Sequence, residues 1–457
     1  MSSRDDASLQ THSQPRGQFS SRLGFVFAAA GSAVGIGNIW GFPTQVADNG
    51  GAAFLVIYLI LSLLLAYPAL VAELMIGRYS QTNPITALER LPHTRAFSKH
   101  GRALGYLAVI TICLIFTFYS IIGGWLIAYG LAPVCSEAGL ETVASWLVSF
   151  TPERNLVMTA CFIVMTLVVV NGGIEQGIEK WSARLMPLLV ILLLILIGCV
   201  IGQDGAVDGL RHYLVPDFRK VTPSLLFNAL GQSFFSMSLG VGAMMAYGSY
   251  LNKQANLPAL ALQVCLLDTG IAFLAGLLVI PCMFVALHGG MMIYDDNGLL
   301  HSSDTLVFDV LPAFFSSLGT IGSVLSVMFF ALMTIAALTS SISMLEVPVS
   351  CLTERGHFSR QQASSAVCLL VMLLCTLVII DFDTLFGGII TLTTRYAQPF
   401  NALLFCLFAG WLMHRNHRLK EIQQGFSQVE ETLFWRIWPW YVRYCCPVLI
   451  GSLLLSG

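Results

Sequence analysis

Long apolar runs, separated by short polar segments, fill most of this chain. A helix needs about 20 mostly apolar residues to cross a bilayer. Eleven runs approach or exceed that length: 21–46, 52–78, 102–134, 155–172, 180–202, 223–250, 256–288, 318–352, 364–381, 385–413 and 440–457. The longest of them predict helices that tilt or extend beyond the bilayer. The pattern therefore predicts an all-α polytopic membrane protein with 11 transmembrane helices.

The polar segments between the runs indicate which side of the membrane each one faces. With the N-terminus in the cytoplasm, 18 of the 23 Lys and Arg residues fall on cytoplasmic segments and four fall outside. Because cytoplasmic loops carry the excess of basic residues, this orientation is predicted, with the C-terminus outside. The polar first residues predict no cleavable signal peptide. We expect a multi-pass protein of the cell inner (plasma) membrane.

The overall composition supports the same class. Hydrophobic residues make up 56% of the chain and charged residues 11%, with a mean hydropathy of +0.77, whereas soluble domains carry about 25% charged residues. A net charge of −2 argues against a nucleic-acid partner. The 12 cysteines lie mostly within apolar runs and lack metal-ligand spacing, so we interpret them as small core residues without a disulfide framework.

Two runs, the first and the sixth, are interrupted by small residues near their centres. The first contains Gly31, Gly35, Gly37, Gly41 and then Pro43. The sixth contains Ser236, Ser238, Gly240 and Gly242. Glycine-interrupted helices at matching positions of two halves indicate a transporter site. An unwound stretch leaves carbonyl groups free to bind cations and helix ends free to bind anions.

The spacing of these two runs predicts an internal repeat. They are five runs apart, and because five is odd, the second set of helices is inverted in the membrane. Close helix packing is the alternative role of the glycines, since Gly31 and Gly35 form a GxxxG pair. Asn38 and Ser32 favour a site, because an unused polar side chain at membrane depth is costly.

Three stretches of the chain carry distinctive motifs. They are GSAVGIGNIWGFP followed by DNGG, GQSFFSMSLGVGAMMAYGSY, and AALTSSISM. Together, from about Arg16 through the eleventh run, they resemble the bacterial, 11-span members of the neurotransmitter:sodium symporter family. The resemblance implies a five-plus-five inverted-repeat fold, with helices 1 and 6 unwound at mid-membrane. The implied divisions are a cytoplasmic tail (1–20), a first repeat (21–202), an inverted second repeat (223–413), a cytoplasmic loop (414–439) and span 11 (440–457).

The resemblance also implies two sodium sites made of oxygen ligands, which suit a hard cation. One would combine the Ala33 carbonyl, Asn38, Ser236, Asp268 and the substrate carboxylate. The other would combine the carbonyls of Gly31, Val34 and Ala336 with the hydroxyls of Thr339 and Ser340. Hydrogen bonds from these two hydroxyls to their own helix are the structural alternative.

A substrate pocket is implied between the interrupted runs. Its residues would be Ala33, Ile36, Gly37, Ile115, Tyr119, Phe235, Ser236, Ser238, Val241, Ser340 and Met344. The Tyr119 hydroxyl and the backbone near Ile36 and Gly37 would hold an α-carboxylate, and Phe235 would roof the pocket. Because three of the other side chains are apolar, we expect a small neutral, apolar amino acid as substrate.

Two single positions refine this expectation. Gly35 stands where monoamine carriers place an acidic residue, which argues against a monoamine substrate. Asp268 stands where many animal members hold chloride beside an Asn, and Ala272, one turn further on, carries no charge. We hypothesise that Asp268 both ligates sodium and replaces chloride, so that no chloride is required. The surrounding residues would be Tyr58, Gln232 and Ser236. A protonated, purely structural Asp268 is the alternative.

Residues for the two gates are also implied, one gate kept and one altered. The inner gate would pair Arg16 with Glu354, with Tyr250 capping the pair and Phe19 plugging the entry. A weak surface ion pair is the alternative role.

At the outer gate, Gly41 and Thr384 replace the family's charged pair. We hypothesise that aromatic packing, with Trp40 and Phe235, closes this side instead. The role of Arg395, inside the tenth run, has no explanation from the sequence.

Several functions compete on these observations. A sodium:amino-acid symporter that binds two sodium ions is favoured by the intact ligand motifs. A proton-coupled carrier, in which Asp268 titrates, and a channel or non-transporting sensor on the same fold are the alternatives. The chain contains no GxxxxGKS and no HExxH, so we expect no enzyme. Expected partners are the amino acid and membrane lipid, with a monomer or dimer as the assembly.

Overall fold

The structure, a computed structural model, describes residues 17–91, 95–290, 306–354, 356 and 358–456. These residues form helices and connecting turns, with no strand among them. Each of the eleven predicted runs is helical. Within the described ranges, seven helices are long and apolar enough to cross a membrane: Ala52–Ser80, Phe97–Glu137, Pro152–Asn171, Ile174–Ile201, Leu257–His288, Gly319–Thr353 and Arg360–Ile380. Counting each of two bent pairs as one span raises the number to nine.

The first part of the chain runs from the first broken span to a helix in the loop after the fifth. Its elements are α1 (Arg22–Ala33), η1 (Gly37–Gly41), α2 (Phe42–Asp48), α3 (Ala52–Leu61), η2 (Ser62–Ala66), α4 (Tyr67–Ser80), α5 (Pro84–Arg90), α6 (Arg95–Glu137), α7 (Glu141–Val148), α8 (Pro152–Asn171), η3 (Ile174–Glu179), α9 (Lys180–Ile201) and α10 (Ala206–Leu214).

The second part begins in the same loop and continues to the eleventh span. Its elements are η4 (Phe218–Lys220), α11 (Pro223–Ser236), α12 (Ala243–Ser249), α13 (Leu257–His288), η5 (Leu306–Val310), α15 (Leu311–Ser317), α16 (Gly319–Thr353), α17 (Arg360–Ile380), α18 (Phe382–Ile390), η6 (Thr391–Ala397), α19 (Gln398–Leu407), η7 (Phe408–Leu412), α20 (Arg415–Gln423), η8 (Val429–Glu431), α21 (Leu433–Trp440), η9 (Tyr441–Cys445) and α22 (Cys446–Ser456).

Local sequence explains where several of these helices begin. The side chains of Asn83, Thr151 and Thr222 each accept a hydrogen bond from a backbone N–H of the first turn that follows. In all three helices, the next residue is proline, whose fixed φ angle and missing N–H suit the first helical position. Capping therefore positions α5, α8 and α11 independently of the apolar runs.

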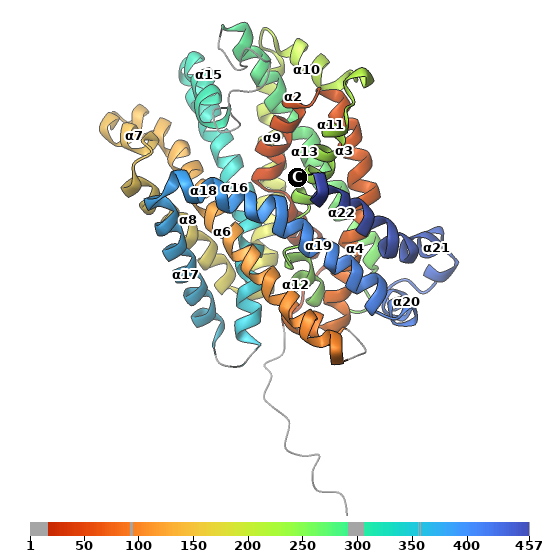
Figure 1. The fold of residues 1–457 in the computed structure, drawn as a ribbon. Coiled ribbons are helices and arrows are strands. Elements are labelled where there is room, and N and C mark those ends of the chain that lie inside the picture. The colour runs from red at the N-terminus through yellow and green to blue at the C-terminus, as the bar shows by residue number, and fades with distance from the viewer. Residues whose placement is uncertain (1–16, 92–94, 291–305, 355, 357, 457) are drawn as a thin grey trace, which may run out of the picture.

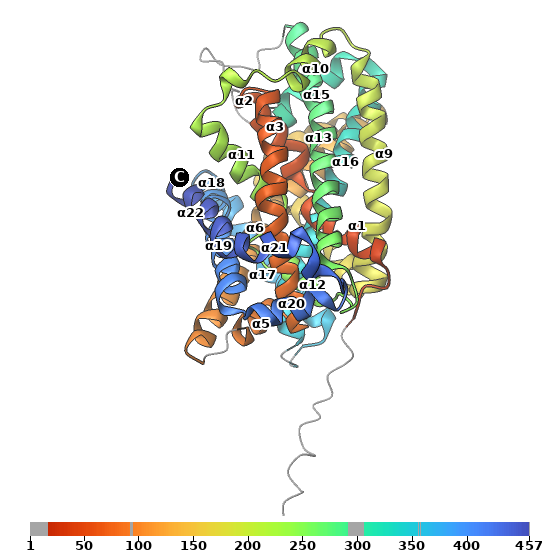
Figure 2. The ribbon, with the colours of Figure 1, turned by 90° about the vertical axis from the view of Figure 1, so that its right-hand side faces the viewer.

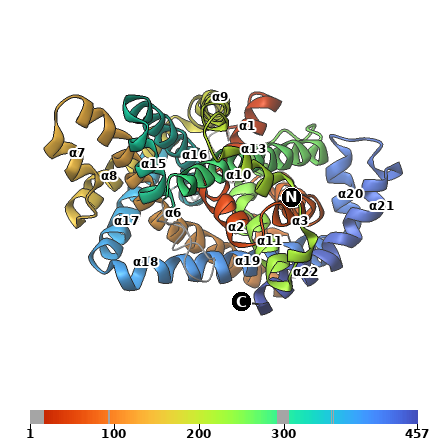
Figure 3. The same cartoon turned by 90° about the horizontal axis from the view of Figure 1, so that it is seen from above.

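The long helices surround a buried centre. α6 and α16 pack against each other, and α1 lies against α9, α13 and α16. Figure 1 shows α7 and α8 on one side of the molecule and α20 and α21 on the other. Figure 2, from the side, places α9 at one edge and α5 and α20 toward the lower end. Seen from above in Figure 3, α13 and α16 run through the middle of this arrangement.

The first and sixth spans are both broken, as their small residues predict. α1 ends at Ala33, and the chain bends by 58° before it continues as η1 and α2. Between α11 and α12, Ser238, Gly240 and Gly242 have positive φ angles of 51°, 80° and 78°. A Cβ on Gly240 would lie 2.1 Å from the Gln398 carbonyl oxygen, so the close approach also requires glycine here.

Candidate functional site

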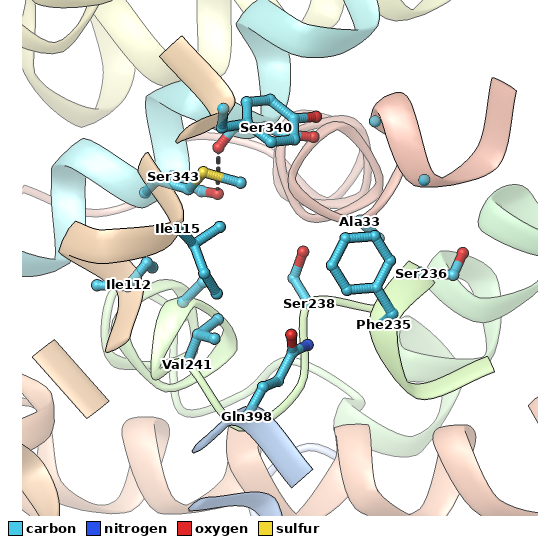
Figure 4. A pocket seen from close by; sticks show the side chains of 15 residues that line it. Ala33, Ile112, Ile115, Phe235, Ser236, Ser238, Val241, Ser340, Ser343 and Gln398 are labelled. Atoms are coloured by element: carbon cyan, nitrogen blue, oxygen red, sulfur yellow. Dashed lines mark hydrogen bonds between the residues drawn. The ribbon is translucent and has the colours of Figure 1, made fainter. Parts of the chain in front are cut away.

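A buried cavity lies where the two broken spans meet α6, α16 and α19 (Figure 4). Its lining residues are Ala33, Gly35, Gly37, Ile112, Ile115, Tyr119, Phe235, Ser236, Ser238, Val241, Ala243, Ser340, Ser343, Met344 and Gln398. Ten of the eleven residues predicted for the substrate pocket are among them. The eleventh, Ile36, lies beside it, because its backbone N–H donates to the Tyr119 hydroxyl at 3.0 Å.

One part of the cavity is polar because backbone and hydroxyl groups approach closely there. A Cβ on Gly35 would lie 2.3 Å from the Tyr119 hydroxyl and 2.6 Å from Ser340 Oγ. Only glycine leaves room for those two hydroxyl groups beside the helix break. The remaining wall carries the side chains of Ile112, Ile115, Val241 and Met344 and is apolar. The cavity thus presents a polar side and an apolar side to a small molecule.

Sequence reasoning missed Gln398, at the start of α19. Its side chain lies in the cavity near Ser238 and Val241 in Figure 4. Gln398 is 2% exposed, and its Oε1 has no hydrogen-bond partner among the described residues. A polar residue in the middle of the tenth apolar run was the available signal. The other lining residues outside the prediction are Gly35, Ile112, Ala243 and Ser343.

Next to the cavity, three side chains from three helices form a compact polar cluster. Asn38 Nδ2 donates to Asp268 Oδ1 at 2.8 Å and to Ser236 Oγ at 2.9 Å. Ser236 Oγ donates to Asp268 Oδ2 at 2.8 Å. The Asp268 side chain is fully buried in α13, and both its oxygens accept hydrogen bonds. These donors favour the charged carboxylate, the form that binds a cation, whereas complete burial favours the neutral acid.

The residues predicted around the chloride position extend this cluster. The Tyr58 hydroxyl donates to Ser236 Oγ at 3.3 Å. Gln232 Nε2 instead donates to the Gly37 carbonyl at 2.9 Å, which ties α11 to η1. Ala272 is buried one turn beyond Asp268 on α13. Ser236 therefore contacts the Asp268 carboxylate directly and Tyr58 reaches it through Ser236, whereas Gln232 holds the backbone of the first broken span.

A second group of oxygens lies where the end of α1 meets α16. Ser340 Oγ donates to the carbonyls of Val34 at 3.0 Å and Gly31 at 3.2 Å. Thr339 Oγ1 donates to the Ala336 carbonyl at 3.0 Å. All five predicted ligands of the second sodium site are thus connected by hydrogen bonds or by sequence. Thr339 adopts the back-bond to its own helix, whereas Ser340 bridges two helices.

Three of the four residues predicted for the inner gate, Phe19, Tyr250 and Glu354, are among the described residues. Phe19 packs edge-on against Tyr247 and Tyr250, with ring centroids 5.7 and 6.4 Å away. Glu354 accepts from the backbone N–H and the Nδ2 of Asn83 at 2.8 and 2.7 Å. Arg16, its predicted partner, lies outside the described residues.

An ion pair that the sequence did not reveal lies beside these residues. The Tyr250 hydroxyl donates to Glu346 Oε1 at 2.6 Å. Glu346 is fully buried and forms a salt bridge with Arg360, whose Nε also donates to the Val170 carbonyl at 2.8 Å. Tyr250 was predicted to cap the Arg16–Glu354 pair, and the structure directs its hydroxyl to this second pair. The pair joins α12, α16, α8 and α17.

Aromatic rings pack around Phe308, at the end of the molecule that the sequence predicts to face outward. Phe308, in η5, lies 5.5 Å from the Trp40 ring, 5.6 Å from Trp125 and 5.0 Å from Tyr129. Phe150 and Phe330 complete the set around it at 6.4 and 6.3 Å. We call these six residues the outer aromatic cluster. The structure therefore gives Trp40 a partner, Phe308, that the sequence did not suggest.

The two positions of the missing charged pair carry no charge here. A Cβ on Gly41 would lie 3.8 Å from the nearest atoms, those of the Gln232 side-chain amide, which is an ordinary van der Waals distance. Thr384 is exposed on α18. Arg395 is exposed in η6.

Two broken helices that meet at a buried cavity, with oxygen clusters beside it, define a secondary transporter. Comparison with known sequences identifies the family within this class of transporters. The profile of the sodium:neurotransmitter symporter family matches residues 16–146 and 148–456. This chain belongs to that family. It is a sodium-dependent symporter of the membrane, with several apolar helices, and not an enzyme.

Individual relatives support the same assignment. An uncharacterised sodium-dependent transporter of Bacillus subtilis, YhdH, is 34% identical over 96% of this chain and 97% of its own length. A sodium- and chloride-dependent taurine transporter of Bos taurus is 25% identical, over 97% of this chain and 77% of its own. The crystal structure of MhsT in complex with L-phenylalanine has a TM-score of 0.82 and 32% identity, covering 97% of this chain and all of MhsT.

Proposed function

We propose that this chain imports a neutral, apolar amino acid together with two sodium ions, and that it does so without chloride. The observation that carries the proposal is the position of the two oxygen clusters beside one cavity. Ser236 belongs to the first cluster and lines the cavity. Ser340 belongs to the second and also lines it. Ions bound at these clusters and a substrate in the cavity would share ligands, so their binding would be coupled.

The two sides of the cavity suit an amino acid. The Tyr119 hydroxyl and the backbone beside Gly35 form a polar side for an α-carboxylate. The apolar wall, with Ile115, Val241 and Met344, suits an uncharged side chain. The MhsT complex contains L-phenylalanine, an amino acid of this type, and MhsT shares the fold.

Asp268 supports chloride independence. Its buried carboxylate lies in the cluster proposed to hold sodium, and it is reached by Tyr58 through Ser236. A fixed negative charge at this position balances a nearby cation, which is the task proposed for chloride in relatives that require it. The hydrogen bonds from Asn38 and Ser236 favour the ionised form, whereas complete burial favours the protonated form, so a bound cation is needed to keep the charge.

Uptake by the purified protein in liposomes tests the proposal directly. Vesicles would be supplied with each of the twenty amino acids in turn, under an inward sodium gradient with gluconate as the anion. We expect accumulation of one or more apolar amino acids, and loss of that accumulation when potassium replaces sodium. Binding without accumulation would indicate a sensor. Accumulation driven by a pH gradient without sodium would indicate a proton-coupled carrier.

A further inference from the structure

Buried N–H donors without acceptors gather where α20, α21 and η9 meet. Arg418 is 4% exposed, yet its Nε and Nη1 have no hydrogen-bond partner in the described part of the chain. The same holds for the buried Nε of Arg443 and the buried indole Nε1 of Trp435. Arg415 joins the group, with its guanidinium 5.6 Å from the Trp435 ring centroid. We call Arg415, Arg418, Trp435 and Arg443 the arginine cluster.

Within the described ranges, no acid forms a salt bridge with the three arginines of this cluster. Burial, followed by repulsion from Arg443 and Arg415, lowers the pKa of Arg418 to about 10. The acid on the same helix, Glu421, is already bound by Arg78 and Lys253. An arginine so deeply buried is costly unless a negative group pairs with it. Since every unsatisfied atom is a donor, the complementary ligand is an anion with several acceptor oxygens.

The surface beside the cluster is apolar and aromatic. Trp411, Leu433, Trp440 and Tyr444 are 50%, 69%, 60% and 39% exposed. The Arg443 guanidinium stacks on the Trp411 ring at 4.0 Å, and Trp411 Nε1 donates to the Arg443 carbonyl at 2.9 Å. Exposed Trp and Tyr at the end of a span are typical of the interface between hydrocarbon and headgroups. The cluster therefore borders a lipid-facing surface.

Local backbone geometry directs Arg443 toward this position. Both η7, which carries Trp411, and η9, which carries Arg443, are π-helical turns. A Cβ on Gly410 would lie 2.8 Å from the Arg443 Cα, so the two spans touch backbone to backbone there. Single π-helical turns are frequent at functional sites because they redirect side chains. The two π-helical turns are thus a second, independent feature that places the Arg443 guanidinium over the Trp411 ring.

We propose that the arginine cluster binds the phosphate of an anionic phospholipid headgroup in the leaflet at the α20 end of the molecule. Arginine matches phosphate oxygens with paired N–H donors, and the Trp435 indole adds a further donor. A lipid is favoured over free phosphate because its acyl chains would lie along the exposed surface that includes Trp411 and Trp440. The bound headgroup would join the tenth and eleventh spans to α20.

Competitive lipid binding tests the proposal. The purified, delipidated protein would receive equal amounts of phosphatidylglycerol and phosphatidylcholine, and native mass spectrometry would count the bound adducts. We expect the wild type to favour phosphatidylglycerol. Arg418→Met is expected to reduce that preference by about fivefold or more, since one basic residue contributes about 1 kcal/mol to binding an anionic lipid. Arg418→Lys, which keeps the charge, is expected to restore part of it.

A matched control and a second ligand separate the alternatives. Arg436→Met removes an exposed arginine on α21 and is expected to keep the preference. If the wild type shows no preference, or if Arg418→Met keeps it in full, the site is wrong. Inorganic phosphate forms the other arm of the experiment. If phosphate alone displaces phosphatidylglycerol at equal concentration, the ligand is free phosphate and the lipid assignment is overturned. Should Arg418→Met fail to fold, Trp435→Phe removes one donor and is expected to weaken the preference.

Discussion

Asp268 is the single residue on which the proposed ion coupling most depends. Asp268→Asn keeps the shape of the side chain and removes its charge. We expect the sodium concentration for half-maximal uptake to rise at least about tenfold in chloride-free medium, because loss of a ligand charge weakens metal binding. Added chloride is expected to restore part of the uptake. Liposome assays in gluconate and chloride would measure both effects.

The neighbouring hydroxyl on α13 provides the control. Among the described residues, the Thr269 hydroxyl donates only to carbonyls of its own helix, to Cys265 at 2.8 Å and to Leu266 at 3.4 Å. Thr269→Val is expected to leave the sodium dependence unchanged. If Asp268→Asn transports normally and still ignores chloride, Asp268 does not replace that ion.

Gly35 is predicted to tolerate no side chain. The Cβ in Gly35→Ala would lie within 2.6 Å of both the Tyr119 hydroxyl and Ser340 Oγ, so these groups must move. Such overpacking costs about 1–3 kcal/mol, and the displaced groups belong to the proposed carboxylate and sodium sites. Substrate affinity, measured by scintillation proximity binding, is expected to fall about tenfold or more. Gly270→Ala, with nothing within 4 Å of its new Cβ, is the matched control and is expected to bind normally.

Gln398 is predicted to adjust which side chains the cavity accepts. Its buried Oε1 is an open acceptor on the cavity wall. Gln398→Leu is expected to weaken binding of amino acids with a side-chain N–H or O–H by about 1 kcal/mol, or roughly fivefold. Binding of purely hydrocarbon side chains is expected to change little. A competition series with phenylalanine, tyrosine and tryptophan would show the difference, and equal losses for all three would contradict this role.

At the scale of elements, the outer aromatic cluster is proposed to close the cavity to the outside. Phe308→Ala removes the ring that contacts Trp40, Trp125 and Tyr129. Because the closed state loses this packing, we expect bound substrate to leave the detergent-purified protein at least about tenfold faster in sodium buffer, since truncating a packed Phe costs about 3–5 kcal/mol. Phe218→Ala, at a Phe that is 60% exposed, is the control. An unchanged dissociation rate would show that another element closes this side.

The elements were predicted well from the sequence, and their contacts less so. Apolar runs predict membrane helices because each run is a local property of the sequence. The bounds are less well predicted: α6 begins at Arg95, before the predicted residue 102, because a helix can continue into polar residues outside the hydrocarbon. Small residues revealed both helix breaks. The Trp40–Phe308 contact and the Glu346–Arg360 ion pair join distant segments, and no local pattern specifies such partners.

The candidate site shows the same difference between local motifs, which the sequence reveals, and contacts between distant segments, which it does not. Residues within the three motifs reached the cavity because two of the motifs form the broken spans and the third lies on α16, which packs against α1. Gln398 was missed because it lies on the tenth span, where no motif drew attention to it. The functions assigned to the ion clusters and the orientation in the membrane stay predictions.

At the scale of the whole molecule, one buried ion pair joins segments far apart in the chain. Arg78 Nε donates to Glu421 Oε1 at 2.8 Å, and both side chains are at most 2% exposed. Lys253 adds a contact to Glu421 at 3.1 Å. The link holds α20 against α4 and the loop before α13, so the segment after the tenth span is anchored to the second span.

Breaking this link is predicted to destabilise the fold. Arg78→Met leaves Glu421 buried with only a partly exposed lysine as partner, which costs about 3–5 kcal/mol for a buried pair. The thermal unfolding midpoint of the purified protein is expected to fall by several degrees. Arg102→Met, which removes the exposed partner of Glu89, is the matched control and is expected to leave the midpoint unchanged. Equal midpoints for the two variants would mean that the α20 link contributes little.

The outer aromatic cluster also determines how closure of the outer side depends on the salt concentration of the medium. Attraction between exposed opposite charges weakens as salt rises, because mobile ions screen it over about 10 Å at 0.1 M. Contacts between rings do not depend on that screening. Without the charged pair at Gly41 and Thr384, closure of the outer side would hold equally in fresh and in saline surroundings. A cell that moves between dilute and concentrated media could then change its sodium supply without changing how tightly the outer side closes.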